Sequence, residues 1–98
     1  MSFEQISASE AKKILKTNSA LLVDIRDSES FSQSHAPPEA FHLTQDNLPS
    51  FLKDTNRNTP VLVICYHGNS SQIVAGYLSE QGFGKVYSII GGYEAWNF

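Results

Sequence analysis

The single cysteine, Cys65, is the residue of this sequence best suited to covalent chemistry. It follows the apolar run 61–64 (VLVI) and precedes a short polar segment, 66–71 (YHGNSS). This order predicts a buried strand, a tight loop and the start of a helix. Helix starts and glycine-containing loops present unpaired N–H groups that form a concavity for a negative charge. A cysteine aimed into such a concavity is favoured as the thiolate, which is the nucleophilic form.

Two other nucleophilic chemistries are tested by the spacing around this cysteine. Cysteine phosphatases use a similar strand–loop–helix cradle but need an Arg six positions after the cysteine, which clamps phosphate through two hydrogen bonds. Here that position is Ser71, and the loop before it contains neither Arg nor Lys. A serine-hydrolase elbow needs Gly-x-Ser-x-Gly, and around Ser70 the second glycine is replaced by Gln72. Both chemistries are disfavoured, whereas an inert buried cysteine remains an alternative on the residues alone.

Strand and helix patterns alternate along the chain and place Cys65 near the end of a strand. Strands are expected over about 20–25, 40–43, 60–66 and 85–89, and helices over about 8–16, 27–31, 72–81 and 93–98, with a further helix capped by Thr44. This alternation predicts an α/β fold, a small parallel sheet of about five strands with helices on both faces. Ligands of such sheets bind beyond the carboxyl ends of the strands.

Several polar side chains are expected near these strand ends. Asp24 and Arg26 lie at the end of the strand over 20–25, where an ion pair or a loop-fixing role is favoured over catalysis. His35 and His42 have no partners at metal-ligand spacing, so structural hydrogen bonds are expected for them and no metal site is predicted.

Composition limits the classes of function that this site can serve. The 98 residues are 41% hydrophobic with a net charge of −3, which predicts one small folded domain over 1–98. The chain has no basic block, so nucleic acid and anionic membranes are disfavoured as partners. No apolar run approaches the roughly 20 residues of a membrane-spanning helix, and the polar start is not expected to be a signal peptide. One cysteine permits no internal disulfide, which favours a reducing compartment such as the cytoplasm.

Three segments, taken in order, resemble the motifs of the single-domain rhodaneses, the thiosulfate sulfurtransferases. They are 22–27 (LVDIRD) followed by Phe31 and His35, the cysteine loop 65–71 (CYHGNSS), and 90–96 (IGGYEAW). The resemblance spans almost the whole chain and is greatest to the bacterial GlpE type. One departure lies at Gln72, where the family often has a Lys that opens the helix.

The resemblance implies sulfur transfer through a persulfide on Cys65, with thiosulfate as donor and ping-pong kinetics. The implied acceptor is cyanide, a dithiol or a thioredoxin-like protein, and neither a metal nor an organic cofactor is called for. The persulfide would be held by backbone N–H groups of the loop, contributed by Tyr66, His67, Gly68, Asn69, Ser70 and Ser71. His67 is interpreted either as a donor to substrate or as a solvent-facing residue. The hydroxyls of Ser70 and Ser71 are compatible with donation to sulfur and equally with helix capping.

Two further classes of function are compatible with the same motifs. One is a sulfur carrier that forms the persulfide but exchanges sulfur with partner proteins. The other is a catalytically idle interaction domain, which the intact cysteine loop disfavours. Because the loop has no Lys or Arg, weak saturation by the thiosulfate dianion is expected, near or above ~1 mM.

Overall fold

The computed structural model describes residues 3–17, 20–27, 40–66 and 68–96. Within them, one sheet contains the strands β1 (Glu4–Ile6), β2 (Leu21–Asp24), β3 (Ala40–His42), β4 (Val61–Ile64) and β5 (Val86–Ile89). The helices are α1 (Ala8–Thr17), α3 (Leu48–Asp54), α4 (Ser70–Glu80) and α5 (Gly92–Trp96). Every strand pair is parallel, in the order β1-β5-β4-β2-β3. The expected α/β fold is confirmed.

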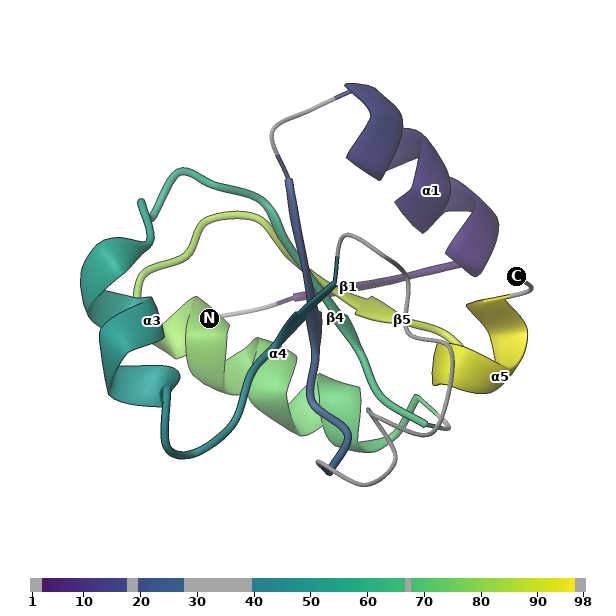
Figure 1. Cartoon of the computed structure of the whole chain (residues 1–98). Helices are drawn as coiled ribbons and strands as arrows, with labels where there is room; N and C mark the ends of the chain where they lie inside the picture. The colour runs from purple at the N-terminus through teal and green to yellow at the C-terminus, as the bar shows by residue number, and fades with distance from the viewer. Residues whose placement is uncertain (1–2, 18–19, 28–39, 67, 97–98) are drawn as a thin grey trace.

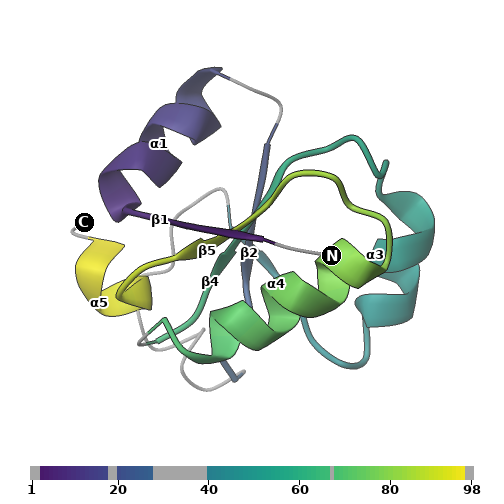
Figure 2. The ribbon, with the colours of Figure 1, turned by 180° about the vertical axis from the view of Figure 1, so that it is seen from behind.

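Strand β4 occupies the centre of the sheet, and helices cover both of its faces. Figures 1 and 2 show α1 and α5 on one side of the sheet and α3 and α4 on the other. All four residues of β4 are buried, which explains why this strand is apolar throughout rather than alternating. Because β4 lies between β5 and β2, its carboxyl end lies between theirs, at the edge where ligands of parallel sheets bind.

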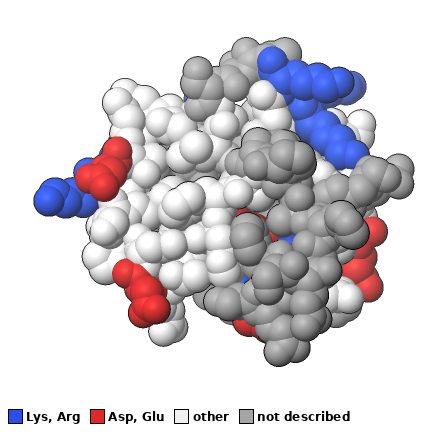
Figure 3. Space-filling view, viewed as in Figure 1, with Lys and Arg blue, Asp and Glu red and all other residues white. Residues whose placement is uncertain are grey.

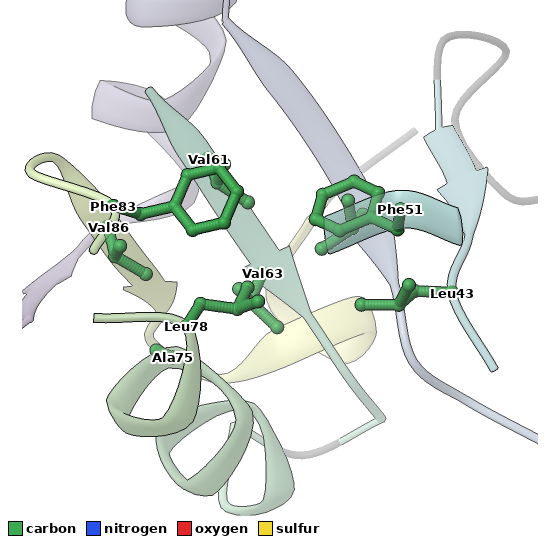
Figure 4. Packing of buried hydrophobic residues seen from close by; sticks show 9 residues of the cluster. Leu43, Phe51, Val61, Val63, Ala75, Leu78, Phe83 and Val86 are labelled. Atoms are coloured by element: carbon green, nitrogen blue, oxygen red, sulfur yellow. The ribbon is translucent and has the colours of Figure 1, made fainter. Parts of the chain in front are cut away.

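One hydrophobic core lies between the sheet and the helices α3 and α4. It fixes α4, the helix that follows the cysteine loop. Val61 and Val63 of β4 share this core with Ala75 and Leu78 of α4, and Figure 4 shows Leu78 next to Val63. The rest of this cluster consists of Val23, Leu43, Phe51, Phe83 and Val86. Burying side chains of this size contributes about 1.5–3 kcal/mol each, so α4 is fixed firmly against β4.

The core on the opposite face anchors α5 and the edge strand. It is formed by Ile6, Ala11, Leu22, Leu62, Ile64, Ile89 and Trp96. Trp96 is 4% exposed, and it ties the short helix α5 to this core. The elements on either side of the β4 carboxyl end are thus held by separate cores.

Two helix starts differ from the sequence expectation. Helix α4 begins at Ser70 rather than about residue 72, which brings the first-turn N–H groups closer to Cys65. Thr44 does not cap α3, because that helix begins at Leu48. Instead the Thr44 N–H donates to Asn47 Oδ1 at 2.8 Å and the Asn47 N–H donates to Thr44 Oγ1 at 3.2 Å, closing a turn ahead of the helix.

The sequence did not place strand β1. It pairs with β5 at the sheet edge and buries only Ile6, so its three residues carry too little pattern to predict a strand. Ser7 caps helix α1, since the Glu10 N–H donates to Ser7 Oγ at 3.1 Å. The predicted helix over 27–31, apart from Asp27, lies outside the described residues, as does His35.

Candidate active site

The Cys65 side chain accepts hydrogen bonds from two backbone N–H groups. It follows the last residue of β4 and is 4% exposed. The N–H of Gly68 donates to its Sγ at 3.0 Å, and the N–H of Ser71 donates to the same atom at 3.3 Å. The concavity expected from the sequence is therefore present, and the sulfur occupies it.

Glycine 68 gives the loop its inward turn. Its φ of +92° lies in the left-handed region, and a Cβ there would stand 2.7 Å from the Gly91 nitrogen. A side chain at this position would force the loop off its support. The curl of the loop thus depends on the absence of a side chain at Gly68.

The two serines at the start of α4 have separate surroundings. The Ser71 hydroxyl is buried and lies 2.7 Å from Ser88 Oγ on β5, so it ties the helix to the sheet. From the sequence, this hydroxyl is expected to donate to sulfur or to cap the helix, and its contact with Ser88 is neither. The Ser71 group that donates to sulfur is the backbone N–H. Ser70 is exposed, and Asn69, at the N-cap, makes no side-chain capping bond.

Helix α5 supports the loop from the other side. The Tyr93 N–H donates to the Cys65 carbonyl at 2.6 Å, and the Glu94 N–H donates to the Tyr66 carbonyl at 3.3 Å. A Cβ on Gly92 would collide with the Cys65 carbonyl and stand 2.7 Å from the Gly68 nitrogen. Gly91 and Gly92 therefore make close backbone contact with the loop.

Asp24 and Arg26 form the expected ion pair. Arg26 Nη2 lies 2.7 Å from Asp24 Oδ2 and Nε lies 3.0 Å from both carboxylate oxygens, with both side chains almost fully buried. The guanidinium carbon lies 4.1 Å from the centre of the Tyr93 ring on α5. His42 Nε2 donates to the Arg26 carbonyl at 2.7 Å, a structural hydrogen bond as expected. The pair links the end of β2 to α5 beside the loop.

Comparison with known proteins identifies the family. A model of the family described as rhodanese-like domain matches residues 7–98. This chain belongs to the rhodanese-like domain family. The motifs over 22–27, 65–71 and 90–96 all fall within the matched residues.

Solved structures agree with this assignment. The chain is similar to a rhodanese-like domain protein from Staphylococcus aureus, with 27% identity, a TM-score of 0.82, and coverage of 97% of this chain and 92% of that one. A Staphylococcus saprophyticus protein matches at 28% identity and TM-score 0.80 over 97% and 94% of the two chains. The polysulfide-sulfur transferase homodimer of Wolinella succinogenes matches at 25% identity and TM-score 0.81, over 96% and 72%. This rhodanese-like domain therefore has a sulfurtransferase among its structural neighbours.

Gln72 of this rhodanese-like domain fastens the loop to the helix. Its Nε2 donates to the Gly68 carbonyl at 3.0 Å, within the first turn of α4. The side chain is thus engaged with the backbone of the cysteine loop, a contact that the sequence could not specify. No cation is supplied at this position, where the family often has a Lys.

The remaining predicted residues lie at the rim or outside the described chain. Tyr66 is 46% exposed, with its ring centre 6.3 Å from that of Tyr93, and His67 falls outside the described residues. Across residues 3–17, 20–27, 40–66 and 68–96, no three His, Cys, Asp or Glu side chains gather as metal ligands. None of the helices in the described part of the chain combines the length and apolar character that a membrane crossing requires.

Proposed function

We propose that this rhodanese-like domain is a thiosulfate sulfurtransferase that carries sulfur as a persulfide on Cys65. The observation that carries the proposal is the pair of N–H groups, from Gly68 and Ser71, that donate to Cys65 Sγ. Donors fixed by the fold stabilise negative charge on sulfur without reorganising during the reaction. Such a site suits a nucleophile that alternates between a thiolate and an anionic persulfide.

The first half-reaction moves one sulfur atom to the enzyme. The Cys65 thiolate attacks the outer sulfur of thiosulfate, the S–S bond of thiosulfate breaks, and sulfite leaves with the electron pair. The terminal sulfur of the new persulfide carries one negative charge, which the loop N–H groups from Tyr66 to Ser71 are proposed to stabilise. Sulfite is released before the acceptor reacts, so ping-pong kinetics follow.

The second half-reaction restores the thiolate. Cyanide, or the thiolate of an acceptor, attacks the outer sulfur of the persulfide. The S–S bond breaks, its electron pair returns to Cys65, and the product is thiocyanate or an acceptor persulfide. Neither step changes the total charge or requires an external oxidant. Asp24 and Arg26 are proposed to position α5 and the loop without taking part in the chemistry.

A persulfide carrier that exchanges sulfur with partner proteins is the second candidate. It is favoured by the lack of a Lys or Arg over residues 65–71 and by the neutral side chain at Gln72. The guanidinium of Arg26 pairs with the Asp24 carboxylate through Nε and Nη2. A small dianion gains little from such a site, whereas a partner protein brings binding energy from its own surface. The similar Wolinella protein is described as a polysulfide-sulfur transferase.

Intact-protein mass spectrometry tests the proposal. After incubation with thiosulfate and removal of the excess, the protein is expected to gain one sulfur atom and to lose it on addition of cyanide. The matched control is Cys65→Ser, which should gain none. No gain from thiosulfate, but a gain from a persulfidated partner protein, would favour the carrier. Cyanide-dependent turnover retained by Cys65→Ser would refute both.

A further inference from the structure

A groove of about 800 Å³ opens beside the cysteine loop, between α4 and the segment that joins β3 to α3. One wall consists of Ser70, Ile73, Val74 and Tyr77, and the other of Thr44, Gln45, Asp46 and Leu48. Residues that follow β2 and β3 complete the lining. The groove is thus part of the same sheet edge as Cys65 but does not include the sulfur.

The α4 wall presents large apolar side chains to solvent. Ile73 is 77% exposed and Tyr77 is 40% exposed. Because they are four positions apart, they lie on the same side of the helix, with Ser70 in the preceding turn. Ser71, which follows Ser70, donates its N–H to Cys65 Sγ. The exposed row of Ile73 and Tyr77 therefore starts next to the cysteine loop. A row of exposed apolar residues beside a reactive group is typical of an interaction surface.

The charges around the groove favour a basic partner. Asp27 and Asp46 contribute carboxylates to its lining, and the one cation among its described lining residues, Arg26, is ion-paired with Asp24. The whole chain carries a net charge of −3. The adjoining surface over α3 is mostly uncharged, with isolated charged side chains at its margin (Figure 3). A second copy of this chain would oppose carboxylates to carboxylates, which disfavours self-association at this face.

We infer that this groove docks a protein that exchanges sulfur with Cys65 and presents an apolar side chain next to a Lys or Arg, close to its own reactive cysteine. The inference rests on the proposed persulfide chemistry and names the class of acceptor. The partner thiolate attacks the outer sulfur of the Cys65 persulfide and forms a new S–S bond. The original S–S bond breaks and its electron pair returns to Cys65, so atoms and charge balance without an oxidant.

Two synthetic peptides of equal length probe the docking surface. Each contains one cysteine and one leucine, and they differ only in two lysines or two glutamates flanking the leucine. Binding is first measured with serine in place of cysteine, by NMR titration that follows the Ile73 methyl groups and the Tyr77 ring. The basic peptide is expected to bind about fivefold more tightly at low salt, since one close charge pair in water contributes about 1 kcal/mol. Its shifts should concentrate on Ile73 and Tyr77.

Charge reversal within the groove supplies the matched comparison. The rate of sulfur transfer from persulfidated protein to each cysteine peptide is measured for Asp46→Lys and Asp54→Lys. Both residues are exposed and both changes alter the net charge equally, but only Asp46 lines the groove. The preference for the basic peptide should fall about fivefold in Asp46→Lys and stay unchanged in Asp54→Lys. Ile73→Ser should slow both peptides, while the cyanide reaction keeps its rate in all three variants.

Each outcome has a separate meaning. Equal rates for the two peptides, with no shift at Ile73, would overturn the docking surface even where Cys65 forms a persulfide. Peptide binding at Ile73 by a protein that never gains sulfur would refute the proposed function and support the docking surface. A dimer in sedimentation that Ile73→Ser dissociates would assign the groove to a second copy and overturn the inference.

Discussion

The cysteine loop and the groove beside it differ in the atoms that form them. The loop is made of backbone: N–H groups reach Cys65 Sγ from Gly68 and Ser71, and those of Tyr93 and Glu94 hold the loop carbonyls. The groove is made of side chains, many of them exposed. A backbone site is altered mainly by changes that move the chain, whereas a side-chain site changes with each substitution. The loop is therefore suited to an invariant reaction and the groove to the choice of partner.

Replacing the sulfur itself has the largest expected effect. Cys65→Ser is nearly isosteric and keeps the surrounding N–H donors, so sulfur transfer should be abolished while the midpoint of thermal unfolding stays within a few degrees. Activity and calorimetry on the same preparation check this. A large loss of stability would mean that the loop depends on the sulfur, and the view of a self-supporting backbone cradle would then be wrong.

Moving the backbone should be nearly as damaging. Gly92→Ala places a methyl group against the Cys65 carbonyl and the Gly68 nitrogen, at a φ of +57°. We expect a loss of about 2–4 kcal/mol in the free energy of unfolding, from left-handed strain and overpacking, and a fall of about 100-fold or more in sulfur transfer.

The matched control for this change is Gly84→Ala. A Cβ at Gly84 meets nothing within 4 Å, so stability and turnover should stay close to those of the wild type. Denaturant unfolding and cyanide-dependent turnover are measured for both variants. If Gly92→Ala behaves like Gly84→Ala, the contact between α5 and the loop has no energetic importance.

Breaking the buried ion pair should lower stability more than it alters the chemistry. Asp24→Asn leaves the buried guanidinium of Arg26 without its carboxylate, which costs about 3 kcal/mol. At temperatures where the variant remains folded, turnover should fall far less than in Gly92→Ala, since neither residue donates to sulfur. Asp54→Asn, at an exposed position, is the control for unfolding measurements. A loss of turnover without a loss of stability would give the pair a role in the reaction.

Gln72 is the case in which a side chain supports the backbone of the cysteine loop. Gln72→Leu removes the hydrogen bond to the Gly68 carbonyl, worth about 1 kcal/mol, and should slow sulfur transfer about fivefold through a less ordered loop. Gln81→Leu, an exposed glutamine beyond the other end of α4, is the control. The kinetics should show a lower rate at saturation with little change in the thiosulfate KM. A change confined to KM would show that Gln72 contacts the substrate instead.

How far the sequence predicts the molecule follows from the same distinction. The buried run of β4, the alternation of elements and the loop after Cys65 are carried by residue type and spacing, so the parallel sheet and the site of the sulfur were predictable. The contacts of Gly92 and Tyr93 with the cysteine loop were not predictable, because they join segments more than twenty residues apart through backbone atoms. The contact between the Ser71 hydroxyl and Ser88 on β5 was likewise not predictable, because only the order of strands in the sheet brings the two residues together. The groove depends on two turns whose geometry the sequence pattern leaves open.

The smallest expected effect is the response of thiosulfate binding to salt. A dianion held by Lys or Arg is released as salt screens the attraction, so its KM rises with ionic strength. Here the loop over 65–71 has no cation and the chain is net negative, so the KM should lie near or above ~1 mM and stay level or fall slightly as salt screens the repulsion. Steady-state kinetics at two ionic strengths measure this directly. A micromolar KM that rises steeply with salt would mean that a basic side chain closes over the loop, and that the site is not built from backbone donors alone.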